Sequence, residues 1–105
     1  MRGEVAVQSW ASGDWKVRKG SEEEFIKRWK VFLEWTKASA PGFLGARLIR
    51  DGQEPAHFVS FAEWDSDEAR QHWRGLPDFA SKMGACRALC DEMRGSDYEL
   101  AAEVR

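Results

Sequence analysis

The chain has 105 residues, a formal net charge of −2 and 32% charged residues, whose two signs are interspersed. This length predicts a single domain with one modest core, and the balanced charge lacks the basic patch that nucleic-acid binding requires. No apolar run approaches the roughly 20 residues of a membrane span, and Val5–Val7 is too short for the apolar region of a secretory signal. We therefore expect a cytoplasmic protein with neither nucleic acid nor membrane as a partner.

Large aromatic residues are abundant, with six Trp and six Phe. Because each buries much area, some are expected to line a pocket or an interface rather than the core alone. Cys86 and Cys90 lie four residues apart and close almost no loop, so we interpret them as small apolar residues in a reducing compartment. No further ligands stand near them at a familiar metal spacing, and we expect no metal site.

The first strand is expected over residues 14–19, where polar and apolar residues alternate before Gly20. Residues 1–13 alternate only weakly, and we expect either an N-terminal extension or a lead-in to that strand. The single domain then occupies residues 14–105.

A long helix is expected next. Ser21 and Glu24 have the spacing of a capping box, and Pro41-Gly42 ends the helical pattern. Trp35 lies at the edge of the apolar stripe. Helical spacing places six residues on that stripe: Phe25, Ile26, Trp29, Phe32, Leu33 and Thr36.

Two strands follow, over residues 43–50 and 56–64, joined by a turn at 51–55. On the first of them Leu44, Ala46 and Leu48 are predicted to share a face. The second strand has two substantially apolar faces, so neither face is expected to be fully exposed to solvent. One would be covered by the chain's own helices and the other by a second subunit. The two faces carry Phe58, Ser60, Ala62 and Trp64, and His57, Val59, Phe61 and Glu63.

The next helix is capped by Asp65 or Ser66, and it is broken at residues 75–77. A further helix is expected to end at Gly95-Ser96, followed by a last strand over residues 98–104. That helix would carry Phe79, Met83, Cys86, Cys90 and Met93 on one face. The order is β-α-β-β-α-β, an α+β ferredoxin-like arrangement with an antiparallel sheet and an interrupted second helix.

Four short motifs carry a family resemblance: Lys19-Gly20-Ser21-x-x-x-Phe25, Pro41-Gly42-Phe43, Phe61-x-x-Trp64 and Trp73-x5-Phe79. In this order the chain resembles the antibiotic biosynthesis monooxygenase family. The resemblance implies a dimeric α/β barrel, in which a homodimer forms through sheet-to-sheet packing. It also implies a ligand cleft between the sheet and the helices of each subunit. The family includes cofactor-independent oxygenases of polycyclic phenols and quinols, and haem-degrading enzymes.

The haem-degrading members have an Asn on the first strand and a His about ten residues after the second Trp. In this chain those positions look like Gly13 and Met83, and the sequence contains no Asn. Because haem chemistry of this kind normally needs an axial His, we expect haem degradation to be the least favoured function. The expected chemistry uses no cofactor.

Oxygenation without a cofactor needs a base and a dry pocket for the substrate anion. His72 and His57 are the candidate catalytic bases, because His titrates near neutral pH. The alternative is that His72 is exposed on a short helix and His57 closes a strand end. Substrate contacts are expected from Trp64, Trp73, Phe79, Met83, Ser60 and Trp29. Each of these could instead be ordinary core.

The favoured function is a cofactor-independent monooxygenase acting on a small aromatic or quinol-like compound. The alternative is a non-catalytic small-molecule-binding or stress-associated barrel protein. A third interpretation is RNA binding, because the segment 58–61 matches the end of the RNA-recognition-motif pattern. The basic residue expected before that segment is missing, so this reading is disfavoured.

Overall fold

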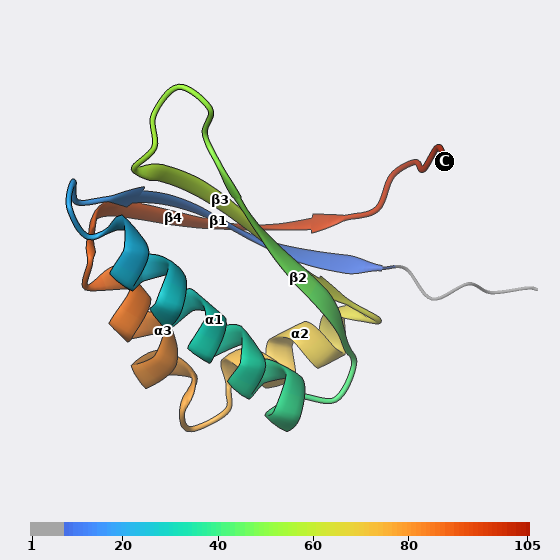
Figure 1. Ribbon diagram of the computed structural model, residues 1–105. Coiled ribbons are helices and arrows are strands. Elements are labelled where there is room, and N and C mark those ends of the chain that lie inside the picture. The colour runs from blue at the N-terminus through green and yellow to red at the C-terminus, as the bar shows by residue number, and fades with distance from the viewer. Residues whose placement is uncertain (1–7) are drawn as a thin grey trace, which may run out of the picture.

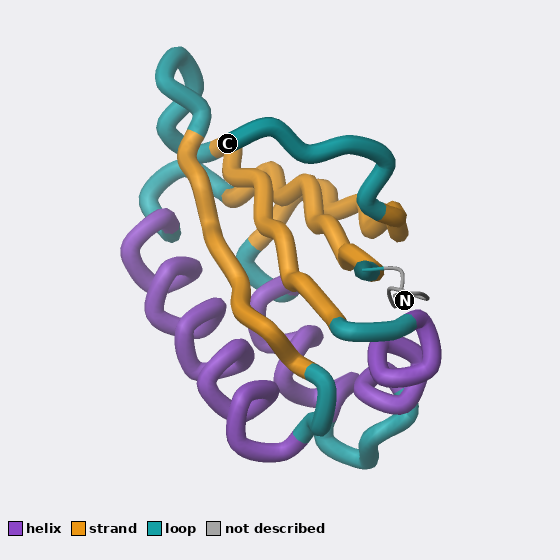
Figure 2. The backbone as a smooth tube through the Cα atoms, turned by 90° about the vertical axis from the view of Figure 1, so that its right-hand side faces the viewer, coloured by secondary structure: helices purple, strands orange, loops and turns teal. Residues whose placement is uncertain are grey.

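The computed structural model describes residues 8–105 (Figure 1). Its four strands form one antiparallel sheet in the order β2-β3-β1-β4. All helices lie on one side of this sheet (Figure 2). The expected α+β ferredoxin-like fold is confirmed, with its second helix divided in two. The elements are β1 (Ser9–Val17), α1 (Glu22–Ser39), β2 (Phe43–Arg50), β3 (His57–Trp64), α2 (Asp67–Arg74), α3 (Phe79–Arg87) and β4 (Cys90–Glu99).

Strand β1 is central and pairs with both β3 and β4. It begins at Ser9 rather than at the predicted Asp14, because the inward-facing residues Ser9, Ala11 and Gly13 are small and give only a weak apolar alternation in sequence. Ser9, Trp15 and Val17 point toward the helices and are buried. Residues 1–7 of the expected N-terminal segment lie outside the described part.

Helix α1 buries the predicted stripe against the sheet, with Ile26 partly covered and Trp35 at its edge. The predicted capping box is wrong, because the Ser21 side chain makes no cap hydrogen bond. The Glu22 carboxylate instead accepts from the backbone N–H of Gly20 at 2.8 Å. Gly20 has φ 97°, a conformation that favours glycine, so the chain reverses there before the helix begins.

Strand β2 contains a bulge between Phe43 and Gly45. The extra residue, Leu44, is therefore turned to solvent, with 52% of its surface exposed. Leu44 is thus more exposed than Ala46 and Leu48, with which it is predicted to share a face and which are partly covered. Strand β3 keeps the predicted alternation, and its even-numbered residues from Phe58 to Trp64 are buried under the helices.

The start of α2 is capped by Ser66, whose hydroxyl accepts from the Ala69 N–H at 3.1 Å. This agrees with one of the two predicted caps. Helix α3 ends at Arg87, and not near residue 95 as predicted. The guanidinium groups of Arg18 and Arg28 donate to the carbonyls of Ala88 and Ala85 at 2.6 and 2.8 Å, which satisfies the free end of α3.

Cys90 and Met93 consequently lie on β4 and not on a helix. Their spacing fits a helix, but pairing with β1 supplies the backbone hydrogen bonds and decides the conformation. The last strand predicted at residues 98–104 is displaced to Cys90–Glu99, and residues 100–105 have no regular structure.

Candidate functional site

A cavity of about 380 Å³ lies between the inner face of the sheet and helices α1, α2 and α3. This volume is within the usual range of small-molecule sites, and the lining is mostly apolar. Of the six predicted substrate contacts, five line it: Trp29, Ser60, Trp73, Phe79 and Met83. Trp64 does not. It is fully buried behind Trp73, with their ring centroids 4.8 Å apart.

The aromatic wall of the cavity is built around Trp73. Phe32 stacks on it with centroids 5.7 Å apart and an interplanar angle of 15°, and Phe79 meets it edge-on at 4.9 Å. The indole N–H of Trp73 donates to Thr36 Oγ1 at 2.9 Å, and the Thr36 hydroxyl donates to the Phe32 carbonyl at 2.9 Å. The ring is therefore fixed in place, and its N–H is already occupied. Trp73 therefore has no free donor for a ligand and contributes apolar ring surface to the cavity.

On the sheet side, polar groups interrupt the apolar lining. Trp15 donates its indole N–H to Ser60 Oγ at 3.0 Å. Both side chains are buried and both line the cavity beside Gly13. These groups face the aromatic wall across the cavity, so a flat ligand can stack on one side and hydrogen-bond on the other.

Charged groups line the cavity where α2 and α3 approach β4. Arg74 on α2 makes a two-pronged ion pair with Asp97 on β4, one of whose distances is 2.9 Å. The Arg74 guanidinium holds the pKa of Asp97 below its usual value, so this carboxylate is a weak base. Arg87 also lines the cavity and makes no ion pair with the described residues. The charge around the cavity is thus net positive.

These charged residues were missed at the sequence level. Arg74 follows Trp73 directly, and its helical position could have indicated it. Asp97 could not be found while residues 90–95 were assigned to a helix, because its place opposite α2 depends on β4.

The sequence profile described as antibiotic biosynthesis monooxygenase matches residues 11–82, which is more than half of the chain. The chain belongs to this family. The matched stretch includes most of the cavity's aromatic wall and the whole of β3.

Similarity to individual proteins is lower. A haem oxygenase described as mycobilin-producing, from Mycobacterium tuberculosis, is 37% identical over 46 residues, which is 44% of each chain. The chain thus matches less than half the length of this curated relative. SnoaB, a cofactor-independent oxygenase from Streptomyces nogalater, was solved as a variant and aligns with TM-score 0.82 at 22% identity, covering 92% of this chain and 95% of that one. An antibiotic biosynthesis monooxygenase family structure from Caulobacter crescentus aligns with TM-score 0.80 at 19% identity, covering 93% of each chain. These structures establish the shared fold.

The residues around the cavity do not fit haem. The described lining contains Met83 and Met93 but no His, which such chemistry needs as an axial ligand. At Gly13, where the haem-degrading motif has Asn, an added Cβ would lie 2.5 Å from Trp15 Nε1. An Asn there would displace Trp15.

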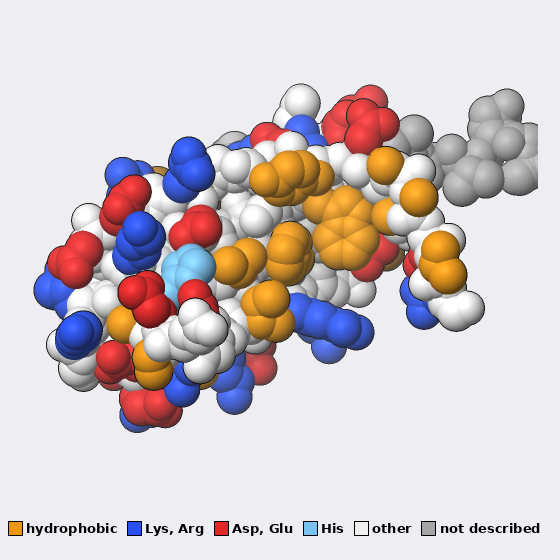
Figure 3. Space-filling view, turned by 90° about the horizontal axis from the view of Figure 1, so that it is seen from above, with side chains coloured by type: hydrophobic (Ala, Val, Ile, Leu, Met, Phe, Trp, Pro, Cys, Tyr) orange, Lys and Arg blue, Asp and Glu red, His pale blue; other side chains and the backbone are white. Residues whose placement is uncertain are grey.

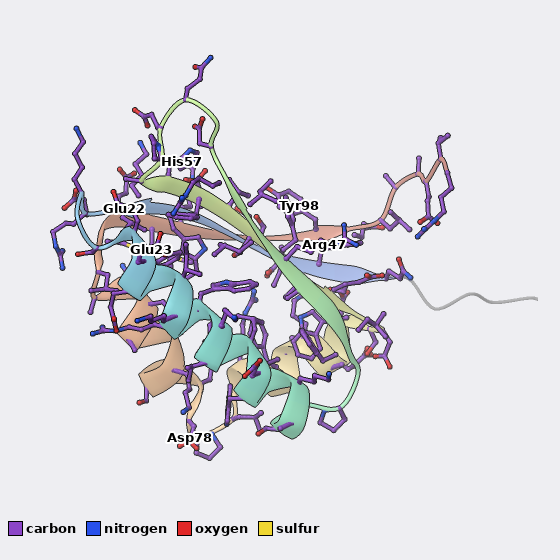
Figure 4. All side chains as sticks on the ribbon, in the orientation of Figure 1. Glu22, Glu23, Arg47, His57, Asp78 and Tyr98 are labelled. Atoms are coloured by element: carbon purple, nitrogen blue, oxygen red, sulfur yellow. The ribbon has the colours of Figure 1, made fainter. Side chains whose placement is uncertain are left out.

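Neither histidine lines the cavity. His57 is on the face of β3 turned away from the helices (Figure 4), where its Nε2 and Nδ1 lie 2.9 Å from Asp14 Oδ1 and Asp51 Oδ2. Hydrogen bonds that the His57 ring donates to the carboxylates of Asp51 and Asp14 raise the pKa of His57. His72 is exposed on α2. Their catalytic roles stay predictions, and in this subunit they would have to act from outside the cavity.

The two thiols are poor nucleophiles. Burial raises the pKa of Cys86 to about 12 and that of Cys90 to about 11, so both stay protonated at neutral pH. Within residues 8–105 no cluster of three or more His, Cys, Asp or Glu could hold a metal ion. The same residues include no helix long and apolar enough to cross a membrane.

Proposed function

We propose that this protein is a cofactor-independent monooxygenase that oxidises a small, planar phenol or quinol. The observation that supports this proposal most directly is the cavity itself, where a fixed aromatic wall faces a buried hydroxyl group. The family assignment and the similarity to SnoaB agree with it.

The proposed reaction is balanced by the substrate and oxygen alone. A phenol with a free ring C–H takes up one O₂, gains one oxygen atom as a quinone carbonyl and releases the other as water. The electrons come from the phenolate, so no external reductant is required. The protein has to bind the anion, exclude water and admit oxygen.

The cavity residues divide this work. Trp73 and Phe32, which are stacked on each other, provide the rigid apolar surface against which the substrate ring packs. Arg87 supplies positive charge that favours the ionised phenol. Because Asp97 is a weak base, turnover is expected to increase with the acidity of the phenol across a panel of substrates.

The test is oxygen uptake with a panel of naphthols, dihydroxynaphthalenes and anthrone, each compared with a protein-free control. We expect turnover with at least one compound and a loss of at least about tenfold in kcat/KM in Trp73→Ala, because the stacking wall is removed. Trp35→Ala is the control for lost packing alone, since Trp35 stacks on Phe32 with centroids 6.4 Å apart but does not line the cavity. No uptake above the control with any compound would refute the proposal.

The predicted bases have their own test within the same assay. His72→Gln and His57→Gln keep polar side chains but cannot exchange a proton near neutral pH. A fall in kcat with loss of the pH profile would support catalysis by that histidine. Unchanged kinetics in both variants would leave proton removal to solvent or Asp97.

A second candidate function is non-catalytic binding of a small aromatic molecule. It is favoured by the absence of His from the described cavity lining, which leaves no group with an ordinary pKa near neutrality there. This function predicts quenching of Trp fluorescence and a higher Tm with a ligand that is not consumed. If no aromatic compound shifts the Tm, this alternative fails.

We also propose that the protein is a homodimer formed through the face of the sheet that carries no helix. Hydrophobic side chains gather on this face (Figure 3). Ile49 and Tyr98 are 54% and 55% exposed there, beside the partly covered Val59, Phe61 and Trp10. An apolar sheet face needs a cover, and a second copy, placing the same face against it, is self-complementary.

A further inference from the structure

The buried polar pair Trp15 and Ser60 has a definite hydrogen-bond polarity. Trp15 is 2% exposed and Ser60 is 8% exposed. An indole N–H can only donate, so in their 3.0 Å hydrogen bond the Ser60 oxygen must be the acceptor. This is the Ser60 side chain's sole hydrogen bond within residues 8–105. The Ser60 proton therefore has no acceptor among those residues.

Gly13 makes this arrangement sterically possible. A Cβ at position 13 would lie 2.5 Å from Trp15 Nε1 and 2.9 Å from Ser60 Oγ. The absence of a side chain on β1 lets the Trp15 indole lie across the strand and reach Ser60 on β3. The pair is thus a built feature of the sheet, and Gly13, Trp15 and Ser60 all line the cavity.

From this polarity we infer that Ser60 is an oriented hydrogen-bond donor, which selects planar aromatic ligands that present an accepting oxygen, either a carbonyl or an ionised phenol oxygen. The inference rests on the proposed function in using the same cavity. It goes further in naming the functional group of the ligand that the site recognises, an accepting oxygen.

The physical reason is the cost of a buried donor without a partner. A hydroxyl group has one proton and two accepting lone pairs. Trp15 occupies one lone pair. The residues beside Ser60 on the same face of β3 are Phe58 and Ala62, and its cross-strand partners are Gly13 and Leu48, none of which has a polar side chain. A ligand carbonyl placed at Ser60 satisfies the remaining proton, whereas a methylene at the same point leaves it unpaired. The site should therefore distinguish two ligands of equal shape.

Fluorenone and fluorene are suitable probes, because they share one planar framework and differ in having a carbonyl or a methylene. Isothermal titration gives a Kd for each without any oxygenation. In the wild type we expect fluorenone to bind about five- to tenfold more tightly, the usual worth of one hydrogen bond. Ser60→Ala alone would free the indole N–H of Trp15 to donate to the ligand, so the preference is expected to fall to about onefold in the double variant Ser60→Ala/Trp15→Phe. The exposed Ser81→Ala on α3 is the matched control and should keep the wild-type ratio.

Trp15→Phe gives an independent test of the polarity. Removing the indole N–H frees the Ser60 oxygen to accept a hydrogen bond from a ligand. The affinity for 9-hydroxyfluorene, which can donate one, divided by the affinity for fluorenone should therefore be about five- to tenfold higher in this variant than in the wild type. This variant keeps Ser60, so the test does not depend on whether Ser60→Ala folds.

The outcomes separate the two proposals. If wild-type protein binds fluorenone and fluorene equally, or the double variant Ser60→Ala/Trp15→Phe keeps the preference, the donor role is overturned while oxygen uptake by phenols stands or falls by itself. If neither probe binds, the inference is overturned as well. A Ser60-dependent preference without oxygen uptake would support the donor role and refute the monooxygenase.

Discussion

At the level of single residues, His57 is bonded through both ring nitrogens to carboxylates, 2.9 Å from Asp14 and 2.9 Å from Asp51. Both nitrogens can donate only when the ring is protonated. The hydrogen bonds therefore raise the pKa of His57 and lower that of Asp51. The cluster ties the turn after β2 to β1, with Lys16 beside it as the cross-strand partner of His57.

Since the pKa of His57 is raised above 6.5 in the folded state, its contribution to stability is complete below about pH 6.5 and is lost as the pH rises through the folded value. We expect urea denaturation to show a stability advantage of wild type over His57→Gln at about pH 5.5 that shrinks by about pH 8.5. His72→Gln, on an exposed site, should follow the wild-type profile. An advantage that grows with pH would contradict this assignment.

At the level of elements, Arg70 fastens α2 to the sheet. Its side chain is only 10% exposed and contacts Ser9 Oγ on β1, Asp67 Oδ1 at 3.0 Å and Asp97 on β4 at 3.8 Å. Ser9 is fully buried, so the hydroxyl depends on this guanidinium. Because α2 carries Trp73, the same contact keeps the aromatic wall against the cavity.

Arg70→Met should lower the free energy of unfolding by about 1–3 kcal/mol, because it leaves a buried hydroxyl without its partner. Arg74→Met should cost less than about 1 kcal/mol, since the Arg74–Asp97 pair is screened by solvent. Urea unfolding monitored by Trp fluorescence measures both. Equal losses in the two variants would show that burial does not distinguish these arginines.

At the level of the whole molecule, one sheet and one layer of helices leave a sheet face uncovered, and the smallest principal extent is only 18 Å. Light scattering should therefore give about twice the chain mass of 12.0 kDa at micromolar concentration.

Val59→Asp on the open sheet face should weaken dimerisation at least about tenfold by burying a charge at the interface. Val31→Asp, on the exposed side of α1, is the matched control and should stay dimeric. A wild-type mass of one chain would refute the dimer.

Several parts of the fold could be predicted from local sequence. The α1 stripe, the alternation of β3 and the Ser66 cap depend on spacing and on residue type, and the structure agrees with each. The same reasoning failed at Ser21 and over residues 90–99. There the Gly20 turn and pairing with β1 decided the backbone, and neither is visible in a local pattern.

The sequence by itself determined which residues alternate and which aromatics recur at helical spacing, because these follow from the periods of a strand and a helix. It thereby grouped Trp29, Ser60, Trp73, Phe79 and Met83, which all line the cavity, while their contact with a substrate stays a prediction. Only the tertiary structure decided which face of β3 the helices cover, and so put Ser60 in the cavity and His57 outside it. It also brought Asp97 to Arg74, since contacts between distant segments depend on strand order and register.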